Sequence, residues 1–115
     1  MKTFAIKTQH RSQMIAVNDQ VQRVIRESNL THEMAVVYVP HTTAGITINE
    51  NADPDVVHDL LGQFDEIVPW HQDFYRHADA NSAAHVKATL TGSSLTVPIQ
   101  RGHLLLGRWQ GIFFL

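Results

Sequence analysis

Four polar residues in the second half of the chain have the types and spacing of a reactive site. His77, Asp79 and His85 fall within nine residues, with Asn81 between the last two. Neutral imidazole is the commonest metal ligand in proteins, and a catalytic zinc ion keeps one position for water. Zinc lowers the pKa of that water to about 7, which supplies a nucleophile at neutral pH. The pattern therefore suggests a divalent metal ion, zinc or magnesium, held by His41, His77 and His85.

Two alternatives remain open for these histidines. Their spacing matches no fixed metal motif such as HExxH, and ordinary capping, packing or hydrogen bonding would account for it at least as well. In the second alternative the site holds no metal, and Asp79 and His85 form a general acid–base pair. Under the catalytic hypotheses, His41, Asp79 and His85 are candidate catalytic residues.

Hydroxyl groups and one cation form a second candidate set, which suits an anion. A helix expected to begin near Ser82 adds free N–H groups at its positive end. Phosphate recognition depends on the supply of hydrogen-bond donors more than on net charge. Serine and threonine are also ordinary residues of strands, and a helical lysine can simply be solvated, so the pattern alone favours a structural role. The candidate substrate-binding residues are Thr42, Thr43, Asn81, Lys87 and Ser94, with Ser93 beside them.

A third polar cluster, Asn49-Glu50-Asn51-x-Asp53, follows a predicted strand. If Asn49 and Glu50 face the pocket, Asn49 binds substrate and Glu50 acts as a general base or orients a histidine. Asp53 fits better as a helix cap, because Pro54 suits the first helical position.

Chain size and composition restrict the class of protein. The chain has 115 residues, 43% of them apolar, which suffices for one domain spanning residues 1–115. The formal net charge is −2 and the basic residues are scattered, which argues against nucleic acid or a membrane as partner. The absence of cysteine excludes disulfides and cysteine-based zinc sites. No apolar stretch approaches the roughly 18 residues of a membrane span, so we expect a soluble cytoplasmic protein.

Two segments near His41 are predicted to be strands. Residues 35–39 are β-branched and aromatic, which favours a strand. Residues 41–50 suit an extended strand because polar and apolar side chains alternate. One face would then present His41, Thr43, Thr47 and Asn49, and the other would pack Ala44, Ile46 and Ile48.

Two helices and the loop between them are predicted around His77, Asp79 and His85. The first helix begins at Asp53-Pro54 and carries an apolar stripe made of Val57, Leu60, Leu61 and Phe64. Residues 69–81 mix aromatic and polar side chains without a period, which suggests a structured loop. Asn81 can cap a second helix that ends at Gly92.

The rest of the chain is predicted to be mostly strands, which together with the helices makes an α+β domain rich in antiparallel strands. Asn18 or Asp19 can cap an early helix. Pro98 indicates an edge strand or a strand end. The apolar end of the chain suggests a truncated chain or a strand buried between subunits. The expected strands cover residues 4–6, 14–17, 95–99, 103–107 and 109–115.

Three segments resemble the signature blocks of the YjbQ family, whose members are also described as secondary thiamine-phosphate synthases. The segments are HTTAGITINENADPDV, HADANSAAHVKATLTGSSLTVPI and GHLLLGRWQGIFF, in order over essentially the whole chain. The resemblance implies an antiparallel α+β fold assembled as a homotrimer. It also implies a polar site near a subunit interface, which in some members holds a metal ion or an anion. The family's recurrent polar residues fall on the candidates above and on Asn51, Trp109 and Gln110.

The chain departs from the family pattern at three places. Ala80 stands where the family usually has glycine, so a positive φ there would be strained. Arg108 replaces a threonine typical before Trp-Gln, which adds a charge beside that motif. The usual continuation, an acidic residue followed by Asp-Gly-Pro-Arg, is absent after Leu115.

The resemblance implies an enzyme acting on a small phosphorylated molecule. The family activity would join hydroxymethylpyrimidine diphosphate to thiazole phosphate and release pyrophosphate, whose charge Lys87, hydroxyl groups and a divalent cation could stabilise. The alternative is a non-catalytic trimeric module that binds a metal or ligand in the same pocket.

Overall fold

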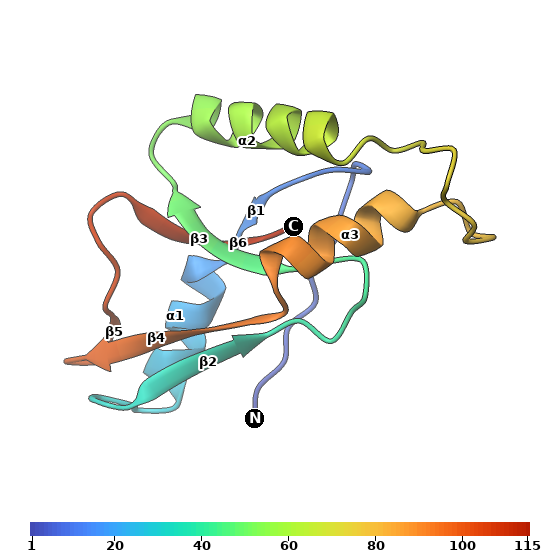
Figure 1. The fold of residues 1–115 in the computed structure, drawn as a ribbon. Coiled ribbons are helices and arrows are strands. Elements are labelled where there is room, and N and C mark those ends of the chain that lie inside the picture. The colour runs from blue at the N-terminus through green and yellow to red at the C-terminus, as the bar shows by residue number, and fades with distance from the viewer.

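The computed structural model describes residues 1–115 and shows a small α+β domain with two antiparallel sheets and three helices (Figure 1). One sheet has the strand order β1 (Ile15–Ala16), β6 (Gln110–Phe114), β3 (Ile46–Glu50). The other has the order β2 (Met34–Tyr38), β4 (Ser94–Gln100), β5 (His103–Leu104). The helices are α1 (Asn18–Glu27), α2 (Pro54–Ile67) and α3 (Ser82–Thr91). The predicted fold class is confirmed.

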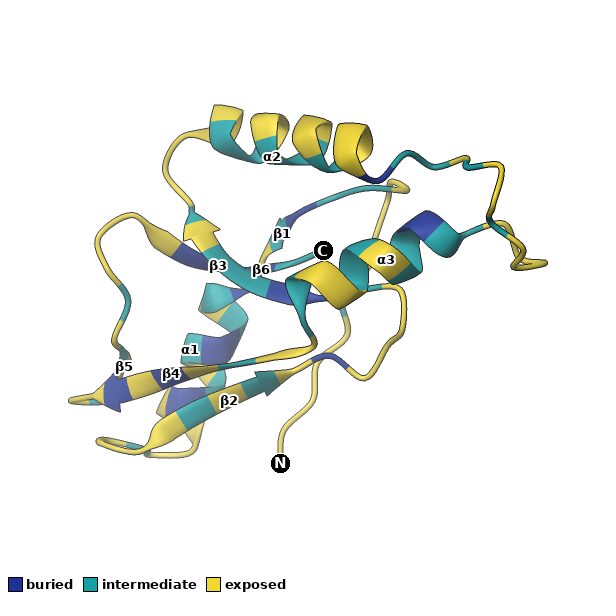
Figure 2. Ribbon diagram, viewed as in Figure 1, coloured by how far each residue is buried: buried dark blue, intermediate teal, exposed yellow.

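The core forms where α1 meets both sheets (Figure 2). Val21 and Ile25 lie one helical turn apart on α1 and share this core with Val97 and Ile99 of β4 and Ile112 of β6. Fully burying an aliphatic side chain of this size contributes about 1.5–3 kcal/mol. The core therefore fixes the two sheets relative to each other and sets the positions of the loops that leave them.

α2 and α3 are less deeply packed than α1. Asp53 caps α2 as predicted, because its carboxylate accepts a hydrogen bond from the Asp55 N–H at 2.9 Å. No residue of α2 is buried, so its predicted apolar stripe is only partly covered (Figure 2). An ion pair of 2.6 Å between Lys87 and Asp65 joins α3 to α2. α3 ends at Gly92, as predicted, where φ is 95°.

One predicted strand is wrong, and a second is wrong in part. Residues 4–6 form no strand, because their alternating side chains find no strand partner in the chain. In the segment 41–50, only residues 46–50 pair with β6. Ile46 already pairs with Phe114, the last residue of β6, so no strand lies opposite residues 41–44. The predicted common strand face of His41, Thr43, Thr47 and Asn49 therefore does not form.

Three smaller expectations also need correction. The cap of α1 is Val17, which places Asn18 and Asp19 inside the first turn. β4 is the central strand of its sheet, and Pro98 pairs with Met34 at the end of β2, so β4 is no edge strand. The strand expected over residues 103–107 is the two-residue β5. No helix has the length and apolar character needed to cross a membrane.

Candidate functional site

The start of α3 brings three of the predicted site residues together. The imidazole rings of His77 and His85 meet edge to face, with ring centroids 5.2 Å apart and planes at 81°. His77 Nε2 lies 3.5 Å from Asp79 Oδ2, and both side chains are exposed. An exposed pair at this distance contributes little to stability, so it acts mainly on how the His77 ring is oriented beside His85.

A tight turn positions His77 and Asp79. The Ala80 N–H donates a hydrogen bond to the His77 carbonyl at 3.0 Å, which closes the turn just before α3. Ala80 has φ of 57°, in the left-handed region. That conformation destabilises a residue with a Cβ by about 1–2 kcal/mol. The strain expected where alanine replaces the family's glycine is therefore present at the edge of the site.

Asn81 occupies the cap position of α3 without capping it through its side chain. Its backbone carbonyl accepts a hydrogen bond from the Ala84 N–H at 3.0 Å. The side-chain Oδ1 is buried and has no hydrogen-bond partner in the chain. The predicted position of the cap is confirmed, whereas the predicted side-chain hydrogen bond is absent.

A polar hollow lies beside this cluster, between α3 and the loop from β2 to β3. His41 and Thr42 come from that loop, and His85 and Thr89 come from α3. Ser93 lies between α3 and β4 on the same hollow. Two histidines that are far apart in the sequence are thus exposed on one surface. Imidazole and hydroxyl groups donate hydrogen bonds in such a hollow, which suits an anionic ligand.

A metal ion does not fit this arrangement within one chain. A zinc site needs at least three protein ligands that point at one centre. No group of three or more histidine, aspartate or glutamate side chains gathers closely enough to hold a metal ion. His77 and His85 meet ring edge to ring face, and His41 shares with His85 a hollow that His77 does not line. The predicted set of His41, His77 and His85 therefore supports no metal-dependent step.

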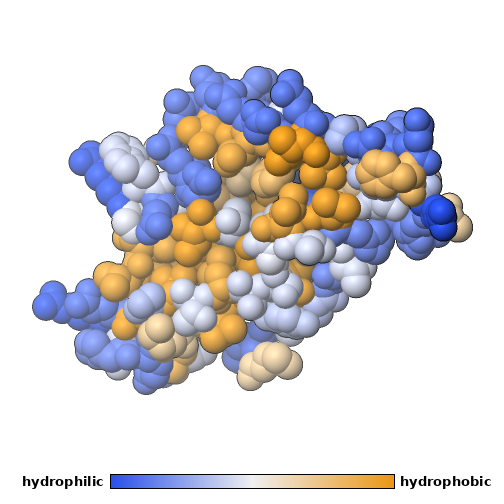
Figure 3. Space-filling model, in the orientation of Figure 1, coloured by the Kyte–Doolittle hydropathy of each residue, from blue (hydrophilic) through white to orange (hydrophobic).

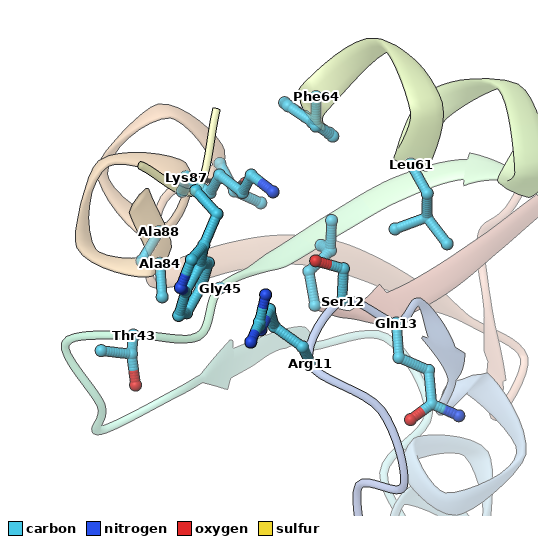
Figure 4. Close-up of a pocket in the computed structure, with 13 residues that line it drawn as sticks. Arg11, Ser12, Gln13, Thr43, Gly45, Leu61, Phe64, Ala84, Lys87 and Ala88 are labelled. Carbon is cyan, nitrogen blue, oxygen red and sulfur yellow. Dashed lines mark hydrogen bonds between the residues drawn. The ribbon is translucent and has the colours of Figure 1, made fainter. Parts of the chain in front are cut away.

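Thr43 and Lys87 line a different cleft from His41 and His85. Lys87 points into the space between α2 and α3, and Thr43 lines the cleft from the loop between β2 and β3 (Figure 4). Lys87 Nζ lies 2.6 Å from Asp65 Oδ1, and the Lys87 side chain is only 18% exposed. The lysine is therefore engaged by α2 and does not reach the polar hollow, so its predicted substrate role belongs to this separate cleft.

Asn49, Glu50 and Ser94 lie away from the hollow. Asn49 and Glu50 end β3, where they pair with Gly111 and Gln110 of β6. Ser94 begins β4 and pairs with Tyr38 of β2. β3 leads from the hollow towards the start of α2 (Figure 1). Asn49 and Glu50 could therefore join a histidine site only if a neighbouring subunit supplied them.

Arg11 and Trp70 were not among the predicted site residues. The Arg11 guanidinium lies over the Trp70 ring, 4.2 Å from its centroid, and both line the cleft between α2 and α3. Arg11 falls in a polar turn and Trp70 in an aperiodic loop. The contact joins segments distant in sequence, so local patterns carry no signal for it, beyond the aromatic residues in the loop that holds Trp70.

The family model described as UPF0047 protein YjbQ-like matches residues 2–115. The UPF0047 protein YugU of Bacillus subtilis is 49% identical over 114 residues, which cover 99% of this chain and 86% of the relative. A UPF0047 protein of Methanocaldococcus jannaschii is 47% identical over 111 residues, covering 96% of this chain and 80% of that protein.

Solved structures of similar proteins share the fold. A YjbQ/UPF0047-family protein of Clostridium acetobutylicum superimposes with a TM-score of 0.92 at 50% identity, over 95% of this chain and 84% of that one. A protein of unknown function from Sulfolobus solfataricus gives a TM-score of 0.89 at 28% identity, over 95% of this chain and 79% of that one. The arrangement of sheets and helices is therefore retained at both levels of sequence identity.

Proposed function

Because the chain belongs to the YjbQ-like UPF0047 family, we propose that it binds a small phosphorylated molecule in the polar hollow beside α3. One observation supports this most: His41 and His85 come from different segments and face the same hollow, with Thr42 and Ser93 beside them. A convergent set of donors on an open surface suits phosphate oxygens, which accept several hydrogen bonds at once. His77 and Asp79 extend the site into the turn that precedes α3.

The proposed reaction joins a pyrimidine diphosphate to a thiazole phosphate to give thiamine phosphate. The thiazole nitrogen forms a bond to the methylene carbon of the pyrimidine, and the bond from that carbon to the diphosphate oxygen breaks. The electron pair leaves with pyrophosphate, so negative charge grows on the leaving group. Donors from His41, His85 and Thr42 stabilise that charge. Asp79 orients His77, which supports the His85 ring.

The proposed site is completed in a homotrimer. A folded monomer of 13.0 kDa exposes about 6,300 Å², whereas this chain exposes 8032 Å². Its radius of gyration is 15.5 Å, against about 13 Å for a compact chain of this length. The chain therefore leaves surface that a partner would cover, and the trimer itself rests on the resemblance to the family.

The exposed face of β2 is the proposed contact surface. β2 is an edge strand, and its outward side chains Met34, Val36 and Tyr38 are 58%, 68% and 66% exposed. Contiguous apolar surface of this kind marks an interaction site. His41 follows β2 closely in the chain, so a neighbour on this face would lie near the hollow.

The experiment is a synthesis assay with purified protein, hydroxymethylpyrimidine diphosphate and thiazole phosphate. We expect thiamine phosphate from the wild type and at least a ~100-fold lower rate from His85→Ala, the usual range for a lost charge-stabilising donor. His103→Ala is the matched control, because His103 lies in β5 and outside the hollow. Equal rates in wild type and His85→Ala would contradict the proposed site.

A non-catalytic binding module is the second candidate, because the hollow is open and has no deeply buried reactive group. Thermal-shift measurement separates the two candidates. A rise in Tm with hydroxymethylpyrimidine diphosphate, lost in His85→Ala and not accompanied by product, would favour the module. Product formation would favour the enzyme.

A further inference from the structure

The cleft between α2 and α3 has the features of a second ligand site. Its walls carry Leu61 and Phe64 of α2, Ala84 and Ala88 of α3, and Trp70 of the loop between the helices. The cavity between them amounts to about 60 Å³ and opens to solvent. It is smaller than a drug-sized pocket, so it admits a small group or the edge of a ring. Apolar side chains gather over this gap on the surface of the molecule (Figure 3).

Arg11 gives the cleft an unpaired cation. Its guanidinium lies over Trp70 at 4.2 Å, and none of the three ion pairs in the chain includes it. Stacking on an aromatic face holds the guanidinium in place and leaves its N–H donors free. Figure 4 shows the guanidinium directed into the cleft beside Ser12.

Lys87 places a second cation across the cleft. Its ammonium group points into the space between the helices, where Asp65 neutralises it at 2.6 Å (Figure 4). Of the charged side chains that line the cleft, Arg11 is therefore the one without an ion-pair partner. The adjoining apolar walls would contact the body of a ligand whose anionic group binds there.

The cleft and the polar hollow use neighbouring faces of α3. Ala84, Lys87 and Thr91 face the cleft, and His85 and Thr89 face the hollow. Residues three or four positions apart share one helix face, so each set forms its own stripe. Ala88 borders both, and a ligand in the cleft would lie next to the hollow without touching its histidines.

We propose that the α2–α3 cleft is a second binding site, which takes a small aromatic anion bearing a phosphate or carboxylate. Arg11 binds the anionic group, Trp70 and Phe64 contact the ring at the mouth of the cleft, and Lys87 stays paired with Asp65. The site is separate from the function proposed for the hollow and shares none of its polar side chains.

The test uses phenyl phosphate as the probe and Trp70 fluorescence as the signal. Trp109→Phe serves as the background, because the chain has two tryptophans. We expect saturable quenching, and an increase in Kd of at least about tenfold in Arg11→Gln, since a charge-assisted hydrogen bond contributes about 1.5–3 kcal/mol. Arg108→Gln is the matched control, because Arg108 also stacks on a tryptophan, at 4.7 Å, but lies outside the cleft.

Asp65→Asn tests the same site by a gain of binding. Removing the Asp65 charge frees Lys87, so phenyl phosphate should bind more tightly than to the background protein. Quenching that does not saturate, or equal Kd values in Arg11→Gln and Arg108→Gln, would overturn the proposal, as would weaker binding in Asp65→Asn. His85→Ala should bind phenyl phosphate in the cleft with the same Kd as the background protein. A failed test of the cleft can therefore be told apart from a failed test of the function proposed for the hollow.

Discussion

Ala80 shows how one residue can affect both stability and site geometry. It adopts φ of 57° immediately before α3, in a turn closed by its hydrogen bond to the His77 carbonyl. The residue types in the loop, taken alone, give no indication of this φ. Comparison with the family's usual glycine did predict it, since glycine is the residue that adopts a left-handed conformation without strain.

Ala80→Gly should stabilise the protein. Relief of the left-handed strain gains about 1–2 kcal/mol, and the greater freedom of glycine in the unfolded chain offsets about 0.4–1 kcal/mol of that. We expect the free energy of unfolding, measured in urea, to rise by about 0.5–1 kcal/mol. Ala78→Gly, in the same exposed loop but without a positive φ, is the control and should be neutral or destabilising. A loss of stability in Ala80→Gly would show that the turn is unstrained.

At the scale of elements, local patterns predict what local interactions decide. The cap Asp53 and the end of α3 at Gly92 were both predicted, because each depends on neighbouring residues. Strands β2 and β4 were predicted from their residue types, and their pairing with each other was not. The role of Lys87 was not, because its partner Asp65 lies on another helix. The strand expected at residues 4–6 failed for a similar reason, since a strand requires a partner that its own sequence does not reveal.

Two glycines should respond in opposite ways to alanine. A Cβ on Gly45 would lie 2.7 Å from the Gly92 carbonyl oxygen, where the start of β3 crosses the end of α3. Such overpacking against backbone typically costs about 1–3 kcal/mol, and it would displace the backbone beside the hollow. Gly62, in the middle of α2, has no atom within 4 Å of the position that a Cβ would take.

Gly62→Ala should therefore stabilise the protein by about 0.5–1 kcal/mol, the difference in helix propensity. Denaturant unfolding of the two variants beside the wild type measures both effects. If Gly45→Ala proved as stable as Gly62→Ala, the close approach between β3 and α3 would be wrong.

At the scale of the whole molecule, the single chain exposes more surface than a compact monomer of its mass. Only 14 of 115 residues are buried. Sequence alone could not indicate this, because apolar residues on β2 look the same whether they face a core or a neighbour. The trimer was expected from resemblance to the family and stays a prediction.

Val36→Glu should dissociate the proposed trimer. The substitution places a charge on the exposed face of β2, where a partner would have to desolvate it without compensation. Light scattering coupled to size-exclusion chromatography should report a mass of three chains for the wild type and one for the variant. Ile67→Glu, at the exposed end of α2, should remain trimeric. Equal masses for wild type and Val36→Glu would place the interface elsewhere.

The most direct test of the proposed function is a calorimetric titration with hydroxymethylpyrimidine diphosphate. We expect saturable binding to wild type and His103→Ala, and at least about tenfold weaker binding to His85→Ala, equivalent to about 1.4 kcal/mol. Equal affinity in all three proteins, or no binding to the wild-type protein, would contradict the claim that the hollow of His41 and His85 binds a phosphorylated molecule.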